Sequence, residues 1–176
     1  IHPIGEWVLR EALRQIASWQ REGLSFGEHL SVNVSPWQFA RDDFVSLVVQ
    51  ALAEHGVATR HLTLELTESA LLYDVQAAIS KLTTLRGHGV RVSLDDFGTG
   101  YSSLAYLKRF PIDKLKIDQS FVRDMDTNPE DAAIVHAIIQ MARALNLKTL
   151  AEGIETEAAI EHLRIHHCDE AQGFYF

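Results

Sequence analysis

Polar side chains recur at or near the carboxyl ends of six short apolar segments of the chain. The set contains four carboxylates, two amides and one lysine, and it consists of Asn33, Glu65, Asp95, Asp96, Lys116, Glu152 and Gln172. One polar residue inside an apolar segment is common, whereas the same arrangement in six segments indicates a shared role. In (β/α) barrels, groups at the carboxyl ends of the strands form the active site. The set therefore predicts one site assembled from all six segments.

Glu65 is flanked by Leu64 and Leu66. A carboxylate in a strand covered by helices loses most of its hydration, at a cost of several kcal/mol when no partner compensates. We therefore expect a cation beside Glu65. A neighbouring lysine or a backbone amide would satisfy any single member of the set, but the recurrence in six segments favours a common cation site.

Oxygen ligands dominate the set. Glu65, Asp95, Asp96 and Glu152 offer carboxylates and Asn33 offers an amide oxygen, while thiolate and imidazole are missing from the set. Hard oxygen ligands suit Mg²⁺ or Mn²⁺ better than Zn²⁺ or copper. The adjacent pair Asp95 and Asp96 is placed to bridge two ions, and two ions about 3.5 to 4 Å apart can clamp both reacting oxygens in phosphodiester hydrolysis.

Lys116 is the one cation of the set. It could hold an attacking water or offset charge that develops on a phosphate, or it could be a structural counter-ion for the carboxylates. The formal net charge of −8 argues against a broad surface for a nucleic acid polymer, which requires clustered Lys and Arg. An anionic substrate would instead need help from metal ions.

Alternating strand and helix patterns position these residues. The β-branched and apolar segments predict strands at residues 30–34, 62–66, 90–94, 114–117, 148–151 and 170–174. Amphipathic periodicity predicts helices at residues 4–21, 42–55, 75–86, 129–145 and 156–163. In the first helix, one face is expected to hold most of the apolar residues, namely Trp7, Val8, Leu13, Ile16 and Trp19, with both tryptophans packed in the core. Asn128 before Pro129, and Thr156, are expected helix caps.

This alternation predicts an α/β fold, a TIM-like (β/α) barrel with six of about eight strands present in 176 residues. We expect residues 1–176 to form one domain that is truncated at both ends, with about two further strands upstream of Ile1. The single cysteine, Cys168, excludes an intrachain disulfide and fits a reducing compartment. No apolar segment is long enough to span a membrane, so the expected location is cytoplasmic.

Six blocks of sequence resemble the EAL-type cyclic-di-GMP phosphodiesterases of bacterial second-messenger signalling. The blocks occur in order at residues 32–39, 65–69, 95–103, 115–122, 151–156 and 172–174. The resemblance implies that Asn33, Glu65, Asp95, Asp96 and Glu152 hold two Mg²⁺ or Mn²⁺ ions. It also implies that Lys116 and Glu152 are catalytic, that Gln172 binds substrate, and that Glu68, Asp118 and Glu155 brace the loop 95–103.

The reaction implied by the resemblance is hydrolysis of one phosphodiester bond of cyclic-di-GMP to linear pGpG. The resemblance further implies a homodimer through the region 95–103 and a parent protein that carries sensor or cyclase domains, which could tether the parent protein to a membrane. The Glu-Ala-Leu motif that names the family is expected upstream of Ile1. A protein lacking that motif is expected to show little or no turnover.

Two other functions stay open at this point. A non-catalytic cyclic-di-GMP receptor with an EAL-like fold would bind the nucleotide without hydrolysing it. A metal-dependent barrel enzyme acting on another substrate would bind two ions but not cyclic-di-GMP. The intact set Asp95, Asp96, Lys116 and Glu152 favours hydrolysis.

Overall fold

Strands and helices alternate along the chain in the computed structural model, which describes residues 2–25, 27, 29–98 and 104–176. The strands are β1 (Leu30–Val34), β2 (Leu62–Thr67), β3 (Arg91–Phe97), β4 (Lys114–Ile117), β5 (Lys148–Ala151) and β6 (Glu170–Ala171). The helices are α1 (His2–Glu22), α2 (Pro36–Ala40), α3 (Phe44–His55), α4 (Glu68–Leu72), α5 (Val75–Gly87), α6 (Leu104–Leu107), α7 (Gln119–Val122), α8 (Pro129–Ala144) and α9 (Glu157–Ile165), with a 3-10 turn η1 (Thr59–His61).

These helices and strands form two compact units. Unit 1 comprises residues 1–93 and 109–111, and unit 2 comprises residues 94–108 and 112–176. The division falls inside β3, whose first residues belong to unit 1 and whose last residues belong to unit 2. Each unit therefore holds part of the predicted set of polar residues.

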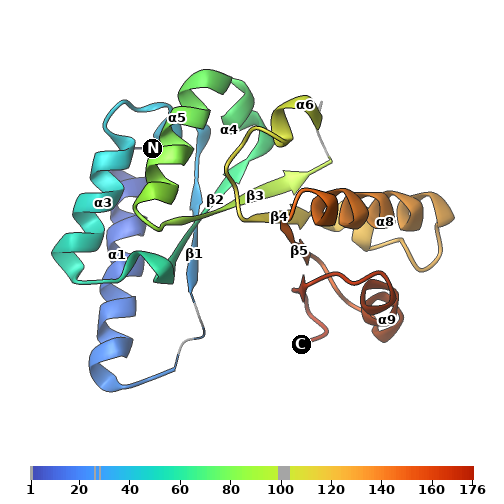
Figure 1. Ribbon diagram of the computed structural model, residues 1–176. Helices are drawn as coiled ribbons and strands as arrows, with labels where there is room; N and C mark the ends of the chain where they lie inside the picture. Colours follow the sequence, from blue (N-terminus) through green and yellow to red (C-terminus); the bar gives the residue numbers. More distant parts are fainter. Residues whose placement is uncertain (1, 26, 28, 99–103) are drawn as a thin grey trace. The chain divides into compact units, whose positions relative to one another are not determined.

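Unit 1 is built on the parallel pair β1 and β2, in which Asn33 is aligned with Glu65. Helices α1 and α3 pack against each other (Figure 1), and both contribute fully buried side chains, including Ile16 and Val48. Burial of such side chains supplies about 1.5 to 3 kcal/mol each. Helix α2 begins at a capping box, in which the Ser35 hydroxyl accepts from the Gln38 amide and the Gln38 side chain accepts from the Ser35 amide.

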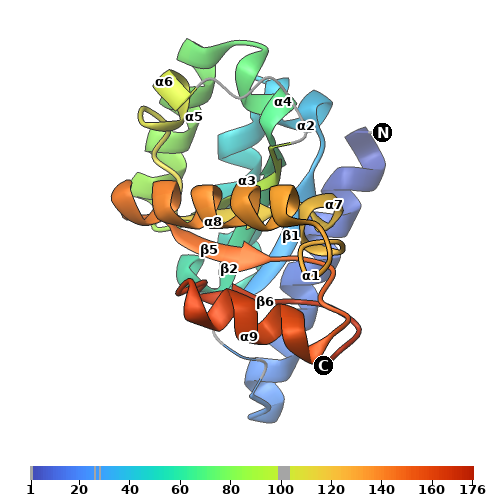
Figure 2. The same cartoon turned by 90° about the vertical axis from the view of Figure 1, so that its right-hand side faces the viewer.

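Unit 2 is built on the parallel strands β4, β5 and β6, in that order. Helix α8 packs on β4 and β5, and Figure 2 shows it alongside β5. Val135 and Ile139 of α8 are fully buried together with Leu115 of β4. The side chains of Asn128 and Thr156 accept hydrogen bonds from the first turns of α8 and α9, as predicted. These caps satisfy backbone amides that the helices leave without an internal partner.

The predicted elements agree with the structure in number and place for the long helices and for β1, β4 and β5. β3 extends to Phe97, whereas β6 ends at Ala171 rather than at residue 174. The expected burial of Trp7 is wrong, because Trp7 is 63% exposed and the buried face of α1 is formed by Leu9, Leu13 and Ile16. None of the described helices is long and apolar enough to cross a membrane.

Candidate functional site

Three carboxylates of unit 2 converge at the ends of β3 and β5. One oxygen each of Asp95, Asp96 and Glu152 lies within 4.8 Å of the others. Adjacent residues of a strand normally point to opposite faces, which would separate Asp95 from Asp96. Asp96 has φ 54°, in the left-handed region that aspartate tolerates better than most residues. This turn of the backbone explains how two adjacent carboxylates reach the same place.

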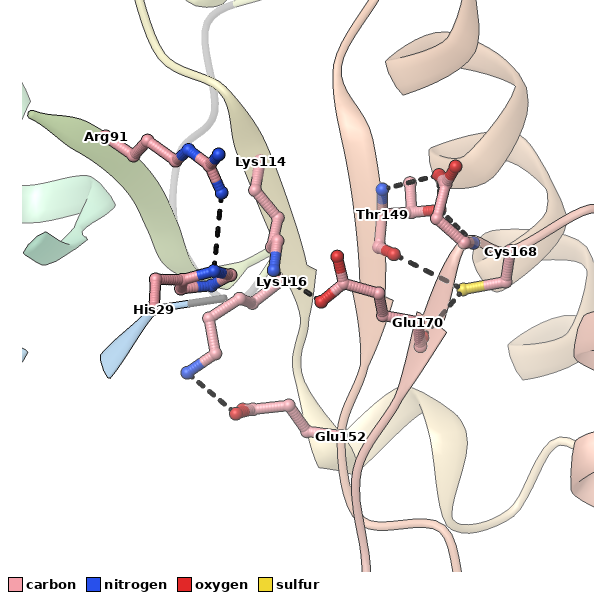
Figure 3. A network of polar contacts seen from close by, with 9 residues as sticks. His29, Arg91, Lys114, Lys116, Thr149, Glu152, Cys168 and Glu170 are labelled. Carbon is pink, nitrogen blue, oxygen red and sulfur yellow. Dashed lines mark hydrogen bonds and ion pairs between the residues drawn. The ribbon is translucent and has the colours of Figure 1, made fainter. Parts of the chain in front are cut away.

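Lys116 of β4 supplies the positive charge of this group. Its Nζ lies 2.8 Å from Asp95 Oδ1 and 2.8 Å from Glu152 Oε1, and its side chain is 6% exposed. Figure 3 shows the side chain of Lys116 directed at Glu152. Charge-assisted hydrogen bonds in such a poorly hydrated place are stronger than exposed ones. Lys116 is therefore fixed between two of the three carboxylates.

The third carboxylate, that of Asp96, is less favourable in its charged form than it would be in water. Burial raises the pKa of Asp96, and the neighbouring charges of Asp95 and Asp118 raise it further, while Lys116 acts in the opposite direction. A divalent cation would favour the charged form of Asp96, since opposite charge at close range lowers a carboxyl pKa. Three hard oxygen donors with a surplus of negative charge fit Mg²⁺ or Mn²⁺ by their chemistry.

Asp118 supports this group from the start of α7. Its carboxylate accepts a hydrogen bond from the Ser120 amide at 2.9 Å, which caps the helix, and its negative charge contributes to the raised pKa of Asp96. The cap fixes the position of the Asp118 carboxylate beside Asp96. The local sequence contained a signal for this cap, because aspartate is a preferred residue at the start of a helix.

Gln172 follows β6 and lies next to the segment that leaves Glu152. The Gln172 amide donates to the Ala151 carbonyl at 2.9 Å, and the Gln172 carbonyl accepts from the Ile154 amide at 3.0 Å. The two hydrogen bonds join Gln172 to residues on either side of Glu152 in the sequence. Gln172 is exposed, so its side chain is accessible to a ligand.

Gly173 makes this approach of the two segments possible, and its role was not predicted. A Cβ at position 173 would lie 2.1 Å from the Ile154 carbonyl oxygen and 2.2 Å from the Ile154 nitrogen. Both contacts are with backbone, which cannot move aside as a side chain can. The Gln-Gly sequence at 172–173 was the only local signal, and a glycine allows such a close approach.

Replacing Gly173 with alanine is expected to lower the free energy of unfolding by about 1 to 3 kcal/mol, the usual cost of overpacking. The added methyl group must displace the backbone at Ile154, two residues after Glu152. Urea unfolding followed by circular dichroism measures the change.

Gly87→Ala is the matched control. Position 87 ends helix α5, and nothing lies within 4 Å of its added Cβ. Alanine has the higher helix propensity, so this variant should be as stable as the parent or more stable by about 0.5 to 1 kcal/mol. Equal losses in the two variants would contradict the role assigned to Gly173.

Unit 1 holds the other two predicted metal ligands side by side. Asn33 and Glu65 are aligned across β1 and β2, so their side chains share one face of the pair. Glu65 is 9% exposed, which confirms that its carboxylate is largely removed from water. Thr63, two residues earlier on the same face, has a buried hydroxyl oxygen without a hydrogen-bond partner in the described part of the chain.

The expected roles of Glu68 and Glu155 concern the loop 95–103. Glu68 begins α4 and is half-buried, and Glu155 is exposed in the segment before α9. Residues 99–103 lie outside the described residues. The bracing of this loop and the homodimer through it therefore stay predictions.

The structure also reveals a partly buried ion pair that was not predicted. Lys114 of β4 pairs with Glu170 of β6, and the side chain of Lys114 is 11% exposed. The sequence around the two residues predicts only that they lie in strands. The signal that could have found the pair is the spacing of Lys114 from Lys116, because residues two apart on a strand share a face.

Comparisons with known proteins identify relatives over the whole chain. A family model described as EAL domain matches residues 1–176. The bifunctional diguanylate cyclase/cyclic di-GMP phosphodiesterase MucR of Pseudomonas aeruginosa is 48% identical over 171 residues, which are 97% of this chain and 25% of that protein. The cyclic di-GMP phosphodiesterase NbdA of the same organism is 44% identical over 176 residues, which are 100% of this chain and 22% of that protein.

Structural comparison agrees with the sequence comparison. A solved structure of the PaMucR phosphodiesterase in a c-di-GMP complex matches with a TM-score of 0.93 at 47% identity, covering 98% of this chain and 70% of that chain. The predicted α/β class and TIM-like barrel fold are confirmed. The chain spans about a quarter of the length of these curated relatives.

Proposed function

Because the chain belongs to the EAL domain family, we propose that it hydrolyses one phosphodiester bond of cyclic di-GMP to linear pGpG, in bacterial second-messenger signalling. The observation that carries the proposal is the group formed by Asp95, Asp96, Glu152 and Lys116, whose chemistry fits phosphodiester hydrolysis. MucR and NbdA, which are 48% and 44% identical to this chain, are named as cyclic di-GMP phosphodiesterases. The net charge of −8 is compatible with an anionic substrate when cations are held at the site.

We assign the metal ligands as Asn33 and Glu65 from unit 1 and Asp95, Asp96 and Glu152 from unit 2, holding two Mg²⁺ or Mn²⁺ ions. When bound, such ions supply Lewis-acid stabilisation of the charge on the phosphate oxygens and neutralise the carboxylates. The burial of Glu65 and the raised pKa of Asp96 support this assignment, because both carboxylates would gain from a cation.

Lys116 and Glu152 are the proposed catalytic residues. The Lys116 ammonium, held by Asp95 and Glu152, would donate a hydrogen bond to the attacking water and offset the negative charge that develops on phosphorus-bound oxygens. The water oxygen bonds to phosphorus as the bond to the 3′ oxygen breaks, and one water proton ends on the released 3′ hydroxyl, so the linear product keeps a 5′-phosphate. Gln172, exposed beside Glu152, would orient the substrate.

The full-length protein incubated with cyclic di-GMP and Mg²⁺ or Mn²⁺ is expected to release pGpG, which chromatography separates from the substrate. Chelation of the metal should abolish the release. Tight binding without pGpG would contradict hydrolysis and support the receptor function. Retention of two ions without binding of cyclic di-GMP would support a different substrate.

The proposal also covers the domains that accompany the chain, its location in the cell and its oligomeric state. The curated relatives are about four times longer, and MucR combines a cyclase with a phosphodiesterase. We therefore propose that the chain acts in the cytoplasm beside sensor or cyclase domains, and as a homodimer through residues 95–103. Sedimentation of the full-length protein measures the oligomeric state.

A further inference from the structure

Strand β4 carries a second buried lysine, Lys114, on the same face as Lys116. The side chains of Lys114 and Lys116 are 11% and 6% exposed, so each ammonium needs a carboxylate partner. Lys116 pairs with Asp95 and Glu152. Lys114 pairs with Glu170. Two lysines on one face of a short strand thus divide three carboxylates between them.

The register of the sheet places Glu170 at the level of Lys116 rather than of Lys114. Lys116 is aligned with Leu150, and Leu150 is aligned with Glu170. Lys114 is aligned with Lys148, two residues earlier along each strand. Residues aligned across parallel strands point to the same face. Glu170 therefore shares both level and face with Lys116, although its carboxylate pairs with Lys114 (Figure 3).

This arrangement makes Glu170 a competitor for Lys116. Opposite charges attract strongly where little water screens them, and Lys116 is almost completely buried. Without the ammonium of Lys114, the Glu170 carboxylate would be left partly buried and without its counter-charge. Lys116 would then be the cation that is aligned with Glu170 across the sheet.

We propose that Lys114 is a positioning residue for the hydrolysis: it holds the Glu170 carboxylate away from Lys116, so that Lys116 stays directed at Asp95 and Glu152. The inference rests on the proposed function, because it concerns the lysine assigned to that reaction. By this inference, the metal ligands and Lys116 are not sufficient for the reaction. Lys116 also needs a second lysine on the same face of its strand, which pairs with a neighbouring carboxylate.

The test measures kcat and KM for cyclic di-GMP hydrolysis by the full-length protein and by four variants of it. Lys114→Met should lower kcat about 10-fold to 100-fold, the scale of a misplaced catalytic group, with KM changed less than about threefold. Glu170→Gln removes the competitor and should keep kcat within about threefold of the parent. The double variant Lys114→Met with Glu170→Gln should recover most of the lost kcat.

A purely structural ion pair predicts a different pattern. Each single variant would then lose activity in proportion to its loss of stability, and the double variant would be no better than Lys114→Met, which would overturn the proposal. If Lys114→Met does not fold, Glu170→Gln decides, because a loss of kcat beyond about tenfold there overturns the proposal. Lys114→Arg keeps the charge and should keep kcat within about threefold.

A crystal structure of Lys114→Met separates this inference from the proposed function, because it requires no turnover. The inference expects the Lys116 ammonium within hydrogen-bond distance of Glu170. Lys116 still paired with Asp95 and Glu152 would overturn the inference, whatever the activity. If the unsubstituted protein does not hydrolyse cyclic di-GMP, the proposed function is wrong. If Lys116 nevertheless turns towards Glu170 in Lys114→Met, the effect of Lys114 on the position of Lys116 is supported.

Discussion

Replacing Asp96 with asparagine is expected to make the metal-free protein more stable above acid pH and to lower kcat at least about 100-fold, the scale of removing one preorganised electrostatic group. Burial and the charges of Asp95 and Asp118 raise the pKa of Asp96 in the folded chain. The folded state therefore favours the protonated carboxyl more than the unfolded state does. Asparagine keeps the shape and removes the ionisation.

The sign of the pH dependence follows from the raised pKa. The contribution of Asp96 to stability is fully present below its unfolded pKa, about 3.9, and is lost as pH rises through the folded pKa. The stability difference between Asp96→Asn and the parent should thus be near zero at acid pH and reach a plateau at neutral pH. Thermal unfolding in EDTA between pH 4 and 8 measures it.

Asp42→Asn serves as the matched control, because Asp42 is an exposed aspartate. It should leave both stability and kcat unchanged. Added Mn²⁺ should raise the unfolding temperature of the parent and of Asp42→Asn but raise that of Asp96→Asn much less, since binding to the folded state stabilises it. A metal response in Asp96→Asn equal to that of the parent would exclude Asp96 as a ligand.

The strands that carry the site were predictable because their signals are local. β1, β4 and β5 begin and end where the apolar, β-branched segments begin and end. The long helices were predictable from their periodicity and from caps such as Asn128 and Thr156. Helices α2, α4 and α7 were missed, since four or five residues are too few to show a helical period.

The residues that shape the site were less predictable, because their partners are distant in sequence. Lys114 and Glu170 are 56 positions apart, and only the register of β4, β5 and β6 brings them together. The clash that requires glycine at position 173 is with Ile154 of another segment. Asp96 was predicted as a ligand from its type, but its left-handed backbone has no signature in the local sequence.

Replacing Lys116 with methionine is expected to lower kcat about 100-fold to 1,000-fold and to destabilise the metal-free protein. Methionine matches the apolar part of lysine but leaves the carboxylates of Asp95 and Glu152 without their shared counter-charge. Breaking a fully buried ion pair costs about 3 to 5 kcal/mol, and residual hydration of Asp95 and Glu152, 13% and 21% exposed, should reduce that cost to about 1 to 3 kcal/mol.

Added Mn²⁺ distinguishes a catalytic role for Lys116 from that of a structural counter-ion. Bound cations would replace the missing charge, so Mn²⁺ should raise the unfolding temperature of Lys116→Met more than that of the parent. A structural counter-ion predicts that kcat recovers together with stability at saturating Mn²⁺. A catalytic lysine predicts that stability recovers while kcat stays low, because the donor aimed at the reacting oxygens is still missing. Lys108→Met, at an exposed lysine, should change neither quantity.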